Sequence, residues 1–165
     1  DGNPNPALTG LAIRMGSAAE LLKPLSFGEH RARGYPPLNA DTLLQKATTA
    51  LLSAKLLLQS GDIDGACNRA YYAMFDAARA ALMAFQNSNE VLSIKTHSGL
   101  ITSFSLQLVK PGAIDLELGK ALNKVEDLRL IGDYKADLIT LEQASWAVQQ
   151  AEIFLLAIRK RFFKD

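Results

Sequence analysis

Apolar residues recur at helical spacing along most of this chain, and the clearest organising stretch is residues 68–85. Its apolar positions follow alternating steps of four and three, which places them on one stripe of a helix: Tyr71, Phe75, Ala78, Leu82 and Phe85. A second stripe beside the first is rich in polar groups: Arg69, Tyr72, Asp76 and Arg79. The pattern predicts a helix with one face in the core, where we expect Phe75, and a neighbouring face available for a polar site.

Four further segments show the same three-four spacing, at about residues 41–59, 97–108, 114–131 and 141–162. Nowhere does a β-branched, alternating run of strand length appear. The expected fold class is therefore all-α, an up-and-down bundle of four to five helices.

Local signals mark several helix ends. Asn39 or Asp41 can cap the first helix, and Gly61 suits the left-handed position in a short turn that leads into the second. Gly132 is the expected end of the fourth helix. Thr140, with Gln143 three residues later, matches a capping box at the start of the fifth.

Residues 1–38 contain five of the six prolines, a composition that opposes long regular structure. We expect an N-terminal extension there, with a short helix near residues 17–22, and a bundle over residues 39–165. The favoured interpretation is a mobile or surface segment, in part added before a natural start at Met15. The alternative is an arm that docks on a partner through four apolar residues: Leu21, Leu22, Leu25 and Phe27.

Composition excludes several classes of function. The net charge of +1 draws the chain neither to nucleic acid nor to a membrane surface as a whole, so any polyanion site must be local. The single Cys67 excludes an internal disulfide, and two separated His residues indicate no metal cluster. There is no apolar run of about 20 residues and no signal-peptide pattern. We expect a cytoplasmic protein that needs no metal and no cofactor.

Three polar clusters could carry chemistry. The first is the polar stripe of the organising helix, where Asp76 and Arg79 could simply form a surface pair. The second is Lys95-Thr96-His97, either a phosphate site at a helix start or, as we prefer, a capping Thr96 with a packed His97. The third is the run from Glu126 to Arg129, followed by Asp133-Tyr134, in which Arg129 is either a structural ion-pair partner or a forked phosphate ligand.

These residues suggest a family. Residues 69–75 (RAYYAMF), residues 95–99 (KTHSG) and the run from Arg129 to Asp133-Tyr134 resemble HEPN domains, the nucleotide-binding domains of higher eukaryotes and prokaryotes. The likeness covers about residues 40–162 and is closest to the small stand-alone prokaryotic branch. It implies a helical bundle that is usually dimeric. The long apolar stripe of the fifth helix also favours a homodimer.

The resemblance also implies function. Many HEPN proteins form a toxin–antitoxin pair with a minimal nucleotidyltransferase, and the active toxins are metal-independent ribonucleases that use an Arg followed by a polar residue and a His. Here Arg129 matches the Arg, Leu130 stands where the polar residue is usual, and no His follows. Asp133 occupies the neighbourhood of that His, but a carboxylate is a weak base at neutral pH. His97 could serve only if the fold brought it beside Arg129.

The leading hypothesis is a HEPN-like module that binds RNA, a nucleotide or a nucleotidyltransferase partner. The expected binding residues are Arg69, Tyr72, Lys95, His97, Arg129 and Tyr134. The rival is a ribonuclease toxin, with Arg129, His97 and Asp133 as its candidate catalytic residues. A third interpretation is a helical scaffold with no role in nucleotide binding.

Overall fold

The computed structural model describes residues 37–134 and 138–163, except for the side chain of Tyr134. The described part is all-α. It contains no strand, and its α-helices are α2 (Ala40–Ser60), α3 (Ile63–Gln86), α4 (His97–Phe104), α5 (Leu116–Tyr134) and α6 (Leu141–Phe162). A short 3-10 helix, η2 (Glu90–Ser93), precedes α4, and a π-helical segment, η3 (Ser105–Val109), follows it. The predicted fold class is confirmed. The interpretations of the N-terminal extension concern residues 1–36, which lie outside the described part.

Helix ends follow the local signals closely. Asn39 caps α2, where its Oδ1 accepts a hydrogen bond from the backbone N–H of Thr42 at 2.8 Å. Gly61 ends α2 with a φ of 86°, a left-handed conformation that Gly adopts without a Cβ clash. Thr140 and Gln143 form both hydrogen bonds of the predicted capping box.

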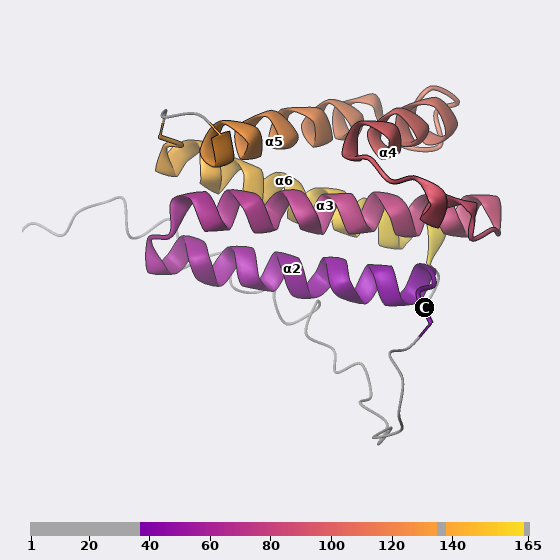
Figure 1. The fold of residues 1–165 in the computed structure, drawn as a ribbon, viewed down its shortest axis with the longest axis horizontal. Helices are drawn as coiled ribbons and strands as arrows, with labels where there is room; N and C mark the ends of the chain where they lie inside the picture. Colours follow the sequence, from indigo (N-terminus) through magenta and orange to yellow (C-terminus); the bar gives the residue numbers. More distant parts are fainter. Residues whose placement is uncertain (1–36, 135–137, 164–165) are drawn as a thin grey trace, which may run out of the picture. The chain divides into compact units, whose positions relative to one another are not determined.

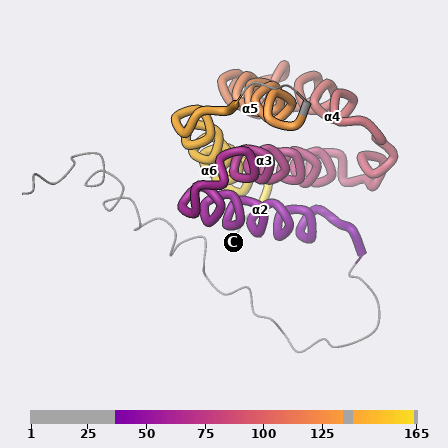
Figure 2. The backbone as a smooth tube through the Cα atoms, turned by 60° about the vertical axis from the view of Figure 1, so that its left-hand side comes forward, coloured from indigo at the N-terminus to yellow at the C-terminus, as the bar shows by residue number. Residues whose placement is uncertain are grey.

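Helix α3 lies at the centre of the bundle (Figures 1 and 2), flanked by α2 on one side and α5 on the other, and it contacts α2, α4, α5 and α6. Seven alanines of α3 are fully or almost fully buried, which allows the neighbouring helices to approach closely. Large side chains fill the remaining core, including Tyr71, Leu82, Phe104 and Phe154. No helix within the described ranges is both long enough and apolar enough to cross a membrane.

The apolar stripe of α3 was predicted correctly only in its middle. Tyr71, Ala78 and Leu82 are fully buried, but Phe75 is only half-buried and Phe85 is 51% exposed. The predicted core position of Phe75 is therefore wrong. Its ring lies where α3 meets the start of α4, at the edge of the core, and stacks on the imidazole of His97.

Gly132 does not end the fourth helix, because α5 continues to Tyr134. A Cβ at Gly132 would lie 2.8 Å from Cδ1 of Ile139, so the glycine permits the chain after the helix to pack closely against it. Asp133 therefore lies within α5, one helical turn after Arg129.

Candidate functional site

His97 is the first residue of α4, and the helix cap fixes its position. Thr96 accepts a hydrogen bond from the backbone N–H of Gly99 at 3.0 Å, so the predicted cap is confirmed. The His97 ring stacks on Phe75 with centroids 4.6 Å apart, and its Nδ1 lies 2.7 Å from the hydroxyl of Tyr71. His97 therefore both packs against α3 and belongs to a polar contact at the edge of the core.

Arg129 reaches the same aromatic group from α5. Its guanidinium carbon lies 5.2 Å from the centre of the Tyr71 ring and 5.6 Å from that of Tyr72, within cation–π range. Its Nε lies 2.9 Å from Oδ2 of Asp133, an ion pair in which the N–H is not aligned for a hydrogen bond. We refer to Tyr71, Tyr72, Phe75, His97 and Arg129 as the Arg129–His97 cluster.

Burial and charge keep the cluster's His neutral. Desolvation is the main cause that lowers the pKa of His97, and the positive charge of Arg129 acts in the same direction, while Glu126 opposes them. Burial, followed by the negative charge of Glu126, raises the pKa of Tyr71, so its hydroxyl keeps its proton. At neutral pH the cluster holds one permanent cation, Arg129, beside a neutral imidazole.

The Tyr71 hydroxyl contacts two groups, His97 and Glu126, and each of them can form a hydrogen bond with it. Glu126 lies close enough for a polar contact with this hydroxyl. If Tyr71 donates its proton toward Glu126, its oxygen accepts from Nδ1–H of His97, and Nε2 is left with a free lone pair. In that tautomer His97 can accept a hydrogen bond or a proton from a bound ligand.

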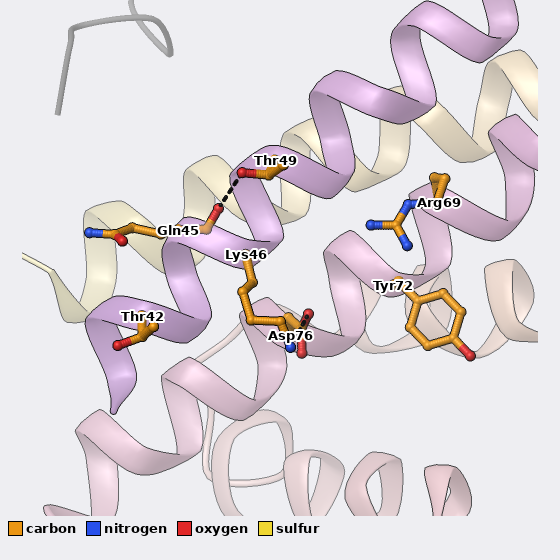
Figure 3. Close-up of a pocket in the computed structure, with 7 residues that line it drawn as sticks. All are labelled: Thr42, Gln45, Lys46, Thr49, Arg69, Tyr72 and Asp76. Atoms are coloured by element: carbon orange, nitrogen blue, oxygen red, sulfur yellow. Dashed lines mark hydrogen bonds and ion pairs between the residues drawn. The ribbon is translucent and has the colours of Figure 1, made fainter. Parts of the chain in front are cut away.

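A groove of about 440 Å³ lies between α2 and α3 (Figure 3). Its lining residues are Thr42, Gln45, Lys46, Thr49, Arg69, Tyr72 and Asp76. Lys46 extends from α2 toward Asp76 on α3, with Nζ 3.6 Å from Oδ2. Tyr72 belongs to both the groove and the Arg129–His97 cluster, so the two features adjoin.

The structure brings together several of the residues that the sequence marked. His97, Arg129 and Tyr72 meet in the cluster, Asp133 pairs with Arg129, and Arg69 lies 5.9 Å from the Tyr72 ring. Lys95 is exposed, and the described residues include no ion pair to it. The side chain of Tyr134 lies outside the described part, so its expected role stays a prediction.

Sequence reasoning missed two members of the site, Tyr71 and Lys46, and gave a third, Glu126, no role beyond that of an acid near Arg129. The helical spacing predicts a core position for the ring of Tyr71 and says nothing of its hydroxyl. The available signal was that a buried Tyr hydroxyl ordinarily needs a hydrogen-bond partner. Glu126 lies three residues before Arg129 and so shares its helix face. Lys46 carried no signal of its own. Within residues 37–134 and 138–163, no group of three or more potential ligands could hold a metal ion.

Comparisons with known proteins identify the family to which this chain belongs. The family model of the HEPN domain matches residues 40–161, so the chain belongs to the HEPN domain family. A UPF0332 protein of Thermotoga maritima is 38% identical over 119 residues, which are 70% of this chain and 85% of that protein. A Methanocaldococcus jannaschii protein named "Putative toxin MJ0605" is 35% identical over 120 residues, 73% of this chain and 86% of its own length.

Proposed function

We propose that this protein is an RNA-binding, toxin-like HEPN module that holds an RNA phosphate at the Arg129–His97 cluster. The observation that carries the proposal is the meeting of Arg129 and His97 on the ring of Tyr71, although the two residues lie on different helices. A guanidinium beside a neutral imidazole supplies a cation and a hydrogen-bonding nitrogen, which is a combination suited to a phosphodiester.

The environment of Arg129 favours phosphate binding. Among the described residues, its recorded ion pair is at Nε, to Asp133, which leaves the terminal nitrogens available for a forked contact. Only 12% of the Arg129 side chain is exposed, so a phosphate that reaches it is partly removed from water. Charge-assisted hydrogen bonds are stronger in such a setting than on an open surface.

The toxin-like part of the proposal rests on relatives. Two proteins that this chain resembles at 35% and 30% identity are named putative toxins. Together with the HEPN fold, this supports a role as one half of a toxin–antitoxin pair whose other half is a minimal nucleotidyltransferase. Co-expression with the product of the neighbouring reading frame, followed by size-exclusion chromatography, tests the pairing. Separate elution of the two proteins would contradict it.

Fluorescence anisotropy with labelled single-stranded RNA tests the binding site. Affinity should fall as salt rises, because phosphate contacts release counterions. Arg129→Ala should weaken binding by about tenfold or more, and Arg129→Lys by less, since Lys keeps the charge but not the forked geometry. Lys120→Ala, an exposed cation near the other end of α5, is the matched control. Wild-type affinity in Arg129→Ala would refute the assigned site.

A second candidate function is metal-independent RNA cleavage at the same cluster. One observation favours it: the fold places a neutral His97 beside Arg129, although no His follows Arg129 in the sequence. With Nε2 unprotonated, His97 could take the proton of an attacking 2′-hydroxyl while Arg129 stabilises the developing charge on phosphate. Binding without cleavage remains our first proposal, because the described part of the cluster has no second group suited to protonate the leaving oxygen at neutral pH.

A further inference from the structure

Two facing polar stripes create the groove between α2 and α3. On α3, Arg69, Tyr72 and Asp76 follow steps of three and four, and they form the polar stripe that lies beside the buried one. The stripe on α2 spans two helical turns and consists of Thr42, Gln45, Lys46 and Thr49. Polar and charged side chains from both helices therefore line this junction, and they are able to contact a polar ligand.

The charges in the groove fit an anion. Lys46 and Arg69 line it, and in Figure 3 the Arg69 guanidinium points into the space between the two helices. The third charged residue, Asp76, is only 7% exposed, and Lys46 and Arg79 stand 3.6 and 3.7 Å from its two oxygens. The positive charges of Lys46, Arg69 and Arg79 outnumber the single negative charge of Asp76, so the net charge around the groove is positive.

Both lining cations are able to engage a ligand. The Lys46 side chain is 54% exposed and its Nζ lies 3.6 Å from Oδ2 of Asp76, so the ammonium can contact an anion in the groove while it stays near the carboxylate. Arg69 has no ion pair within the described ranges and contacts the Tyr72 ring at 5.9 Å. Thr49 donates its hydroxyl proton to the carbonyl of Gln45, which leaves its oxygen as an acceptor only.

Tyr72 connects the groove to the Arg129–His97 cluster. The guanidinium carbon of Arg69 lies 5.9 Å from the centre of the Tyr72 ring and that of Arg129 lies 5.6 Å from it, so both cations contact one aromatic residue. A polyanion that contacts Arg129 would therefore pass Tyr72 to reach the groove.

We infer that the groove between α2 and α3 is a second phosphate subsite, in which Lys46 and Arg69 hold a neighbouring phosphate of the RNA strand bound at Arg129. The inference rests on the proposed RNA binding at the cluster. It assigns the strand a path across α3, past Tyr72, toward α2. A free mononucleotide offers the same phosphate chemistry, and the test below separates the two ligands.

The test compares single-stranded RNA of about ten nucleotides with uridine monophosphate, by anisotropy for the RNA and calorimetry for the nucleotide. Arg69→Gln and Lys46→Gln are the groove variants, Arg129→Ala is the cluster variant, and Lys120→Gln is the control. Circular dichroism checks that each variant is folded. Arg69→Gln is the safer groove variant, because it breaks no ion pair among the described residues.

The expected result is that each groove variant weakens RNA binding by about three- to tenfold and lowers the salt slope by about 0.7, the value for one phosphate of a single strand. Uridine monophosphate should bind each groove variant as it binds the wild type. Wild-type RNA affinity and slope in both groove variants, with binding lost in Arg129→Ala, would overturn the subsite and leave the proposed function intact. Loss of nucleotide binding equal to that of RNA would also overturn it, since the groove would then be a mononucleotide site. No RNA binding by the wild type would refute both proposals.

Discussion

Replacing Tyr71 with Phe removes one hydroxyl from a fully buried residue and leaves its ring in place. That hydroxyl lies 2.7 Å from Nδ1 of His97, within a contact that joins α3 to the start of α4. A neutral hydrogen bond contributes about 0.5–1.5 kcal/mol to stability, and a partner left unpaired at a partly buried site adds to the loss. We therefore expect Tyr71→Phe to lower the free energy of unfolding by about 1–2 kcal/mol.

Urea unfolding followed by circular dichroism measures this loss, and Tyr72→Phe is the matched control. The Tyr72 hydroxyl makes no hydrogen bond within the described part of the chain, so its removal should cost less than about 0.5 kcal/mol. A double-mutant cycle with His97→Phe, which keeps a ring against Phe75, isolates the coupling between Tyr71 and His97. A coupling energy near zero, or equal losses in the two Tyr variants, would refute the hydrogen bond as the link between α3 and α4.

Three further predictions follow from burial, charge and exposed surface. Phe75→Ala should cost about 2 kcal/mol in urea unfolding, less than the 3–5 kcal/mol expected for the fully buried Phe104, and an equal cost would contradict the half-buried position of Phe75. Unfolded His97 takes up a proton near pH 6.5, whereas the folded pKa is lower, so stability should fall as pH drops below about 6.5. His97→Gln should flatten that part of the stability–pH curve, and an unchanged curve would exclude His97 as its source. Light scattering at micromolar concentration should give the mass of a homodimer, because α6 exposes the apolar residues Leu141, Ile153 and Leu156, and a monomer mass throughout would contradict this.

Features set by neighbours in sequence could be predicted from the sequence. Asn39, Gly61 and Thr140 act within one helical turn of their own position, so the local pattern contains all the information that their caps require. Gly132 shows the limit of such signals. Glycine both ends helices and permits close packing, and only the position of Ile139 reveals which of these applies.

The candidate site depended on contacts that sequence spacing does not encode. His97 and Arg129 are 32 residues apart and meet only because α4 and α5 both pack against α3. The same limit explains Phe75, which continues the spacing of the buried stripe but lies where the bundle opens toward α4. Residue type and helical period together predicted the polar stripe of α3, whereas the facing stripe on α2 emerged only when the two helices were placed side by side.

Incubation of the protein with end-labelled RNA in EDTA tests the central claim most directly, when the same samples are run on native and on denaturing gels. The account predicts a complex on the native gel that weakens as salt rises and is weaker by about tenfold or more in Arg129→Ala, with full-length RNA on the denaturing gel. Cleavage in EDTA that both Arg129→Ala and His97→Ala abolish would contradict it, and would instead establish the cluster as the active site of a metal-independent ribonuclease.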